Sequence, residues 1–593
     1  MRSKPRSTAI EAAPDGRAPG ALRLALWRAR WRPRRAEGTG AWTVFATVLA
    51  GIIMLPIGTI IVLALSAEQN VWPHLLATVL PRALADTFIL MAGVGAVSLA
   101  LGTAAAWLVS MYRFPGRGLL DRLLVLPLAM PTYIVAYCYV ELLDYSGPVQ
   151  QMLRALFGWQ SARDYWFPEI RTLGGCVLVL ASVLYPYVYL SARASFAQQS
   201  VCVLEVARTL GQTPFGAFQS VALPLARPAL AAGVALVLME CLNDLGAAQY
   251  LGVQTLTVSI YTTWLQRSNL AGAAQIALVA LLLVLALLFS ERMARGGARV
   301  HHTTGRYRAI PFSDLQGWRA YFVAAACAIP VIVGFIVPLL VLLTQASTYL
   351  SEALMLGFWR AVRNSVTVAG AAAAATVCAG LALVYARRLT ANAFVRAVVP
   401  IASLGYALPG TVLALGLLLP LAAFDNAADT FLRSTIGVSS GLFLSGSLFI
   451  IALAYTVRFL AIALGSLEAG FEKLSPNLDA VARTLGETAL SSLRRVHVPL
   501  LIPALGAAAL LVFVDGMKEL PATLLLRPFN FETLATHAYS YAALEQFEGA
   551  ALGALTIVLI GLVPVLLLHQ AVAGGRAGAS LTAGGGPPSA PGR

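Results

Sequence analysis

Long apolar stretches separated by short polar segments recur along the whole chain. Most are as long as the roughly 20 residues that a helix needs to cross a bilayer. None alternates apolar and polar residues with a period of two, which argues against membrane-spanning β-strands. We therefore predict an all-α polytopic membrane protein with about twelve transmembrane helices, arranged as two parallel six-helix repeats. The predicted spans are 41–66, 86–110, 120–143, 174–192, 228–249 and 272–290, then 320–344, 364–385, 396–423, 440–463, 501–520 and 551–571.

Composition and charge agree with this interpretation. Hydrophobic residues make up 59% of the 593 residues and charged residues only 12%, which is too apolar for a soluble fold. Most lysines and arginines fall in segments that face the cytoplasm if both termini lie there, as the positive-inside rule requires. The net charge of +15 therefore reports membrane orientation and does not indicate nucleic-acid binding.

These features divide the chain into five parts. The first apolar stretch is too long and too far from Met1 to be a cleaved signal peptide, so we expect a retained helix. The parts are a basic cytoplasmic tail (1–40), a first six-helix repeat (41–291), a basic cytoplasmic linker (292–319), a second six-helix repeat (320–572) and a disordered cytoplasmic tail (573–593).

The pentapeptide Ala-Arg-Thr-Leu-Gly occurs twice, at residues 207–211 and 482–486. In each copy a proline, Pro224 or Pro499, follows the glycine by thirteen residues. The offset of about 275 residues indicates two fused copies of one unit. Because each unit has an even number of predicted spans, both loops should lie on one face of the membrane, the cytoplasmic one.

Each half also carries a proline in its third predicted span. Ala129-Met130-Pro131 and Ala407-Leu408-Pro409 occupy equivalent places. Proline frees a backbone carbonyl and bends a helix. We expect a kink there of the kind that a gate could use.

The sequence shows no pattern typical of an enzyme or of a metal centre. The six cysteines form no Cys-x-x-Cys pair and mostly fall in predicted spans, so packing is their expected role. There is no Gly-x4-Gly-Lys-Ser/Thr phosphate loop and no recognisable set of nucleophile, base and orienting group. We expect no catalytic residue, no bound cofactor and no firm metal ligand in this chain.

The first repeated loop matches a known pattern. Glu205-Val206-Ala207, followed by Gly211 and by Leu223-Pro224, resembles the Glu-Ala-Ala loop of ABC importer permeases. The resemblance implies a type I ABC importer permease fold, in which a short helix broken at the glycine seats in a groove of a cytoplasmic ATPase. It further implies two copies of that ATPase, one for each loop, which would use the ATP.

The second loop departs from the pattern, because Ala480 stands in place of the glutamate and Asp479 precedes it. Coupling through this loop is therefore expected to be weaker or shifted. The coupling residues that the resemblance implies are Glu205, Ala207, Arg208, Gly211, Leu223 and Pro224 in the first loop, and Asp479, Ala482, Arg483, Gly486 and Pro499 in the second.

Two further stretches, residues 184–189 and 518–528, resemble ferric-iron importer permeases, and the likeness extends from about residue 41 to 571. It implies a permease of the bacterial inner membrane that receives Fe³⁺ from a periplasmic binding protein. Fused permeases for thiamine, phosphonate-type or polyamine cargo share the architecture and remain alternatives. A secondary transporter is a second alternative, and a membrane enzyme or a scaffold a third.

Ionisable residues in the fifth and eleventh predicted spans are candidates for the translocation path. Glu240 and Asp244 are four residues apart, so we expect them to share one face of a helix. Asp515 and Glu519 repeat that spacing, with Lys518 beside them. Charges inside a membrane are costly and usually face a pathway or a partner. The alternative is structural neutralisation, with Lys518 paired to Asp515, Asp244 or Glu519. The path candidates are Glu240, Asp244, Asp515, Lys518, Glu519 and Tyr185.

Overall fold

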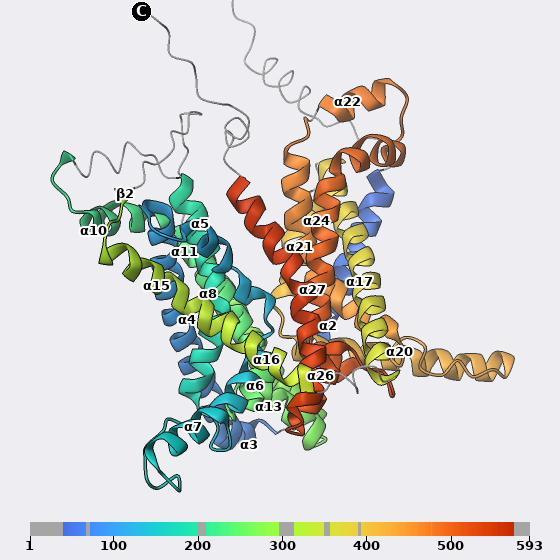
Figure 1. Cartoon of the computed structure of the whole chain (residues 1–593). Coiled ribbons are helices and arrows are strands. Elements are labelled where there is room, and N and C mark those ends of the chain that lie inside the picture. Colours follow the sequence, from blue (N-terminus) through green and yellow to red (C-terminus); the bar gives the residue numbers. More distant parts are fainter. Residues whose placement is uncertain are drawn as a thin grey trace, which may run out of the picture.

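The protein is a bundle of long helices, seen from the side in Figure 1. The computed structural model describes residues 39–66, 71–198, 209–295, 313–348, 356–389, 393–475 and 477–574. Within these residues eleven helices are long and apolar enough to cross a membrane, and one bent pair of helices would make a twelfth. The predicted all-α membrane architecture is confirmed. Glu205, Ala207, Arg208, most of both tails and residues 296–312 of the linker lie outside the described residues.

The long helices repeat in the two halves in the same order, except that shorter helices replace the third one in the first half. The first half has α2 (Thr39–Ser66), α4 (Leu80–Met111), α8 (Leu173–Gln198), α11 (Leu223–Asn243) and α14 (Leu270–Arg295). The second has α15 (Trp318–Val331) running through η5 (Ile332–Ile336) into α16 (Val337–Thr348), then α17 (Leu356–Leu389), α20 (Gly410–Ile436), α21 (Leu448–Glu472), α24 (Val498–Lys518) and α27 (Phe547–Gly574).

Short helices connect the long ones and also repeat in part. In the first half they are α3 (Trp72–His74), η1 (Leu75–Val79), α5 (Arg117–Leu123), η2 (Leu126–Ala129), α6 (Thr132–Leu143), α7 (Pro148–Phe157), α10 (Pro214–Ala217), η3 (Phe218–Ala222), α12 (Gly246–Tyr250), α13 (Leu256–Tyr261) and η4 (Thr262–Gln266). In the second they are α18 (Ala393–Ala402), α19 (Leu404–Ala407), α22 (Asn477–Thr484), α23 (Ala489–Ser492), η7 (Leu493–His497), α25 (Pro521–Leu526) and α26 (Leu534–Ala543).

The prolines of the third span end a helix instead of kinking one, so the predicted continuous span is wrong. Met130 and Leu408 are extended, with ψ of 121° and 128°, and the prolines after them are the N-caps of α6 and α20. Proline disfavours helical geometry in the residue before it. In the first half the chain turns by 95° at this break. Both prolines are buried.

The fifth span ends earlier than predicted, at residue 243 instead of 249. Helix α11 ends at Asn243, and Asp244 is its extended C-cap, with ψ of 124°. Glu519 caps α24 in the same way, with ψ of 116°. Asp244 therefore does not share a helical face with Glu240, as its spacing had suggested, because the helix has already ended. Both carboxylates instead sit at the turn that leads into a short helix, α12 or α25.

The first helix of each half packs against the other half. Ala46, Ala50 and Ile53 form one stripe of α2 and are buried in the apolar core of the second half. In return, Cys327 and Leu342, from α15 and α16, are buried in the core of the first half. The two halves are therefore interlocked, and each supplies a helix that covers the apolar surface of the other.

A two-stranded parallel sheet secures one of these exchanged helices. Strand β1 (Tyr112–Arg113), at the end of α4, pairs with β2 (Ser313–Asp314), just before α15. The pairing is extended by the Leu315 N–H, which donates to the Arg113 carbonyl over 3.1 Å. It holds the start of α15 against the first half.

We expect a chain cut between residues 296 and 312 to regain function only when both pieces are produced together. Each piece alone would expose the apolar surface that the exchanged helix covers, so it should aggregate or be degraded. Co-purification through a tag on one piece, followed by a transport assay, measures this. Pieces that are separately monodisperse and never associate would contradict the interlocked packing.

Candidate functional site

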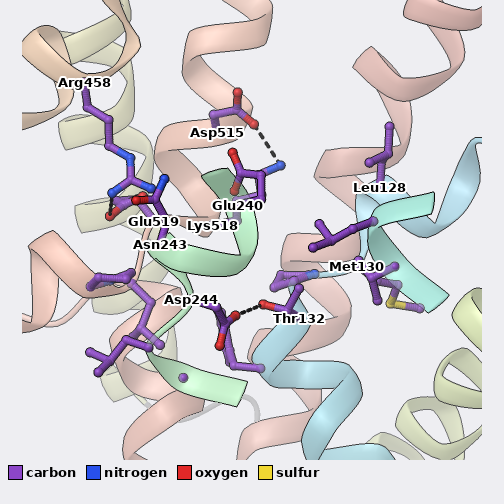
Figure 2. Close-up of a pocket in the computed structure, with 18 of the residues that line it drawn as sticks. Leu128, Met130, Thr132, Glu240, Asn243, Asp244, Arg458, Asp515, Lys518 and Glu519 are labelled. Atoms are coloured by element: carbon purple, nitrogen blue, oxygen red, sulfur yellow. Dashed lines mark hydrogen bonds and ion pairs between the residues drawn. The ribbon is translucent and has the colours of Figure 1, made fainter. Parts of the chain in front are cut away.

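A cavity of about 110 Å³ lies between the two halves, at the ends of α11 and α24. The breaks of both third spans open onto it, since Pro131 and Thr132 line it from one side and Tyr406 from the other. Figure 2 shows charged side chains from both halves converging on this space. The polar residues that line it are Thr132, Tyr133, Tyr187, Glu240, Asn243, Asp244, Tyr406, Arg458, Asp515, Lys518 and Glu519.

The repeat-related carboxylates Asp244 and Glu519 are held in different ways. Asp244 accepts hydrogen bonds from the Thr132 hydroxyl and, at 3.0 Å, from the Ala248 N–H. Glu519 accepts from the Ala522 N–H at 3.2 Å and forms an ion pair with Arg458, whose Nη1 lies 3.1 Å from its Oε1. The first half therefore satisfies Asp244 with neutral hydrogen-bond donors. The second half instead neutralises Glu519 with the positive charge of Arg458.

A glycine makes room for this ion pair. Gly410 follows Pro409 just as Thr132 follows Pro131. A Cβ at Gly410 would lie 2.5 Å from Nη1 of Arg458 and 2.9 Å from Oε1 of Glu519. Sequence reasoning missed Arg458, although a single arginine about ten residues into the apolar span of α21 was a usable signal.

Lys518 pairs with Asp515 on its own helix, at 2.8 Å between Nζ and Oδ1. Of the three partners considered from the sequence, the structure thus selects Asp515. Glu240, which corresponds to Asp515 in the first half, instead accepts a 2.7 Å hydrogen bond from the Tyr406 hydroxyl. Four carboxylates therefore face two cationic side chains, and in the described part of the chain no basic residue forms an ion pair with Glu240 or Asp244.

Buried polar atoms without protein partners continue from the cavity. Both polar atoms of the Asn243 side chain and the Tyr133 hydroxyl are buried with no hydrogen bond to any described residue. The Tyr133 ring contacts Tyr137, which in turn contacts Tyr250, with ring centroids 5.8 and 4.5 Å apart. The hydroxyls of Tyr137 and Tyr250 are equally unpartnered within the described residues.

This row of tyrosines leads away from the repeated loops. Arg171 lies over the Tyr250 ring, 5.1 Å from its centroid. Arg171 comes just before α8, and the other end of α8 leads toward the first loop. Tyr250, which contacts Arg171, therefore lies near the end of the bundle opposite to that loop. Tyr185 is fully buried but does not line the cavity, whereas Tyr187, two residues on, does. Tyr187 is therefore a better path candidate than Tyr185.

The two repeated loops reach the same end of the molecule, where Figure 1 shows α10 and α22. Gly211 and Gly486 have the same φ of 84°, a left-handed conformation that favours glycine. The leucine before each glycine is strongly exposed, with Leu210 at 78% and Leu485 at 77%. These two exposed leucines, each before a glycine of the same φ, form a repeated apolar surface feature that sequence reasoning missed.

The other coupling candidates in the described residues lie close to these turns. Leu223 and Pro224 begin α11, and Pro499 is in the first turn of α24. Ala482 is buried in α22, where Arg483 is exposed and donates from Nε to the Asp479 carbonyl over 3.2 Å. Their roles in coupling stay predictions.

Asp479 does not present its charge at the surface, contrary to its expected part in docking. It is 8% exposed. Its Oδ2 lies 2.6 Å from Nε of Arg388 on α17, and its Oδ1 lies 2.7 Å from Nε2 of the buried His497 in η7. Arg388 also donates to the carbonyls of Phe471 and Ser475. Asp479 therefore anchors α22 to the transmembrane helices.

A different carboxylate lies at the surface of the second loop. Glu487 follows Gly486 and accepts hydrogen bonds from the Ser491 hydroxyl and from Arg495. These two donors, the Ser491 bond foremost, hold the pKa of Glu487 below its usual value, so it stays ionised at neutral pH.

Comparison with known proteins assigns the architecture to a family. Residues 98–295 match the model of the family described as binding-protein-dependent transport system inner membrane component. The chain is 26% identical to the Fe(3+)-transport system permease protein FbpB 2 of Haemophilus influenzae over 491 residues, 82% of this chain and 89% of that one. It is 23% identical to the ferric transport system permease protein FbpB of Actinobacillus pleuropneumoniae over 83% of this chain and 71% of the relative.

A third relative resembles one part of the chain more strongly. The sulfate transport system permease protein CysT of Escherichia coli is 32% identical over 208 residues, which cover 34% of this chain and 71% of that protein. The predicted resemblance to ABC importer permeases is thereby confirmed. This chain belongs to the family of binding-protein-dependent transport system inner membrane components, and it is a multi-pass ABC importer permease of the inner membrane.

Proposed function

We propose that this permease conducts ferric iron, which a periplasmic binding protein delivers and which ATP hydrolysis by a separate ABC ATPase drives inward. The observation that carries the proposal is the charge of the central cavity, where four carboxylates face only Arg458 and Lys518. With all groups ionised, this cavity carries a net charge of about −2. Such a site attracts a cation and repels an anion.

The alternatives differ in the charge of their cargo. Sulfate and phosphonate-type cargoes are anions, which a negatively charged cavity disfavours. The relatives named for iron match more than four-fifths of this chain and so extend over both halves, whereas the sulfate permease matches about a third. Thiamine and polyamines are cations and stay open as cargo until tested.

The donor atoms around the cavity suit a hard cation. Carboxylate, amide and phenol oxygens are the ligands that such ions prefer. Glu240, Asp244 and the unpartnered Asn243 and Tyr133 supply these atoms from the first half. Among the described residues, no three His, Cys, Asp or Glu side chains are grouped as metal ligands. The path in this proposal runs past Glu240, Asp244, Asp515, Lys518 and Glu519.

Coupling would take place at the end of the bundle that bears α10 and α22. The sequence contains no phosphate-binding loop, so ATP would be bound by the partner ATPase and not by this chain. We propose that two copies of the ATPase dock there, one on Leu210 and Gly211 and the other on Leu485 and Gly486. This end and both termini would face the cytoplasm, in keeping with the placement of the basic residues.

We expect Glu240→Gln to reduce iron uptake about tenfold or more while leaving the amount of folded protein unchanged. The amide oxygen can still accept the Tyr406 hydrogen bond, so the change removes mainly the charge. At an effective dielectric constant of about 20, one charge a few ångströms from a cation is worth several kcal/mol. Radioiron uptake into proteoliposomes holding the permease, the ATPase and the binding protein measures the effect.

The matched control is Asp429→Asn, the same acid-to-amide change on α20 outside the cavity lining. It should transport iron at the normal rate. Unchanged iron uptake by the Glu240 variant would contradict the proposed path. Uptake of thiamine, a polyamine or a phosphonate in preference to iron would overturn the cargo. Uptake that needs an ion gradient but no ATPase would favour a secondary transporter.

A further inference from the structure

A large groove lies on the outside of the first half, away from the central cavity. It encloses about 1280 Å³ between α4, α11 and α15 and extends to α10 and η3. Its walls are mostly aliphatic and aromatic, with Trp107, Phe218 and Phe322 among them. Trp318 and Phe322 are 73% and 67% exposed, so the groove opens to the surroundings of the bundle.

Two arginines stand in these apolar walls without an ion pair to any residue that the structure describes. Arg227 belongs to α11 and Arg319 to α15, and both are exposed. Neither forms an ion pair or a hydrogen bond with a described residue, and Arg319 lies beside Trp318, with its Cζ 5.9 Å from the ring centroid. The lining contains no Asp or Glu. Two unneutralised guanidinium groups in an apolar groove match a ligand with an anionic head and a hydrocarbon tail.

One of the two arginines has no counterpart in the second half. At the repeat offset, Ile502 of α24 replaces Arg227. An arginine on the outside of a transmembrane helix is costly unless something satisfies it, and Ile502 shows that the fold does not require one at this position. Arg227 is therefore a feature of the first half that the repeated fold does not require.

We propose that this groove binds one anionic phospholipid from the leaflet on the side of α10. Arg227 and Arg319 hold the headgroup phosphate through charge-assisted hydrogen bonds. An acyl chain lies along the apolar wall of α4 and α15. Because Phe215 of α10 and Phe218 of η3 belong to the lining, the bound lipid also steadies the segment that follows Gly211. Anionic lipid thereby supports the first coupling loop, whichever cargo is carried.

To test the proposal, a phospholipid is titrated into the delipidated full-length protein in detergent, and native mass spectrometry measures the bound fraction. Phosphatidylglycerol should bind more tightly than phosphatidylcholine of the same chain length. Arg227→Gln and Arg319→Gln should each weaken phosphatidylglycerol binding about fivefold, the equivalent of about 1 kcal/mol per basic residue. Both variants should leave the binding of phosphatidylcholine unchanged. Arg494→Gln, an exposed arginine of η7 outside the groove, is the control and should change neither.

Ala104→Trp tests the apolar wall separately, because Ala104 lines the groove and is exposed. The bulky ring should weaken the binding of both lipids, and inorganic phosphate should not displace the bound phosphatidylglycerol. Equal affinity for the two lipids, or full preference for phosphatidylglycerol in the double arginine variant, would overturn the proposal. So would displacement by inorganic phosphate alone, which would indicate a simple anion site.

Discussion

Arg458→Met is expected to destabilise the protein by about 3–5 kcal/mol, the usual loss when one member of a buried ion pair is removed. Arg458 and Glu519 are 7% and 6% exposed and lie against each other in the second half. Without the guanidinium, the Glu519 carboxylate would stay buried with only the Ala522 N–H as a donor. A lower thermal transition of the detergent-solubilised protein and less folded protein in the membrane measure the loss.

Combining Arg458→Met with Glu519→Gln should restore most of the lost stability, because the neutral amide can accept the same backbone hydrogen bond. Lys518→Met is the matched control, since the Lys518 and Asp515 side chains are about a quarter to a third exposed. Lys518→Met should lower the stability of the protein clearly less than Arg458→Met does. Equal losses for the two single variants, or no rescue in the double variant, would show that the Arg458–Glu519 pair does not hold this end of α24.

Gly211→Arg and Gly486→Arg should each lower ATP-driven uptake more than tenfold while the protein remains folded in the membrane. A Cβ at either glycine would meet no atom within 4 Å, so the new side chain projects outward and would obstruct a docked partner. The backbone strain of a non-glycine residue at φ of 84° is about 1–2 kcal/mol. Uptake and retention of the ATPase on the immobilised permease are the two measurements.

Gly158→Arg and Gly437→Arg provide controls with the same kind of strain. These glycines end α7 and α20 at φ of 70° and 74°, and a Cβ at either would also meet open space. Both lie outside the repeated loops, so their variants should transport normally. If all four variants lose function equally, backbone strain explains the loss. Normal uptake by both loop variants would refute the docking assignment.

Much of the architecture follows from the sequence, because hydropathy and repeats are local properties of the chain. The number and order of the spans, the fused repeat and the concentration of acids at residues 240–244 and 515–519 can all be read without coordinates. The family assignment followed from short loop motifs for the same reason, since a turn such as the one at Gly486 depends on neighbouring residues alone.

The partners of those residues depend on contacts between distant segments. Glu519 is neutralised from another helix, in a space that exists only because residue 410 is glycine. Asp479 belongs to a loop motif, yet Arg388 and His497 draw it inward. The spacing of Glu240 and Asp244 suggested a shared face because a helix was assumed to continue through both.

The sequence by itself thus determined that this is a membrane protein with about twelve spans. It also determined that the protein is built from two copies of one unit, each with a matching loop. Only the tertiary structure decided which charges are paired, which loop residues reach the surface and which half each first helix covers. The physical reason is that a helix crosses a membrane by virtue of its own composition. Charge pairing and the exchange of α2 and α15 are instead settled by the surface that each segment meets after folding.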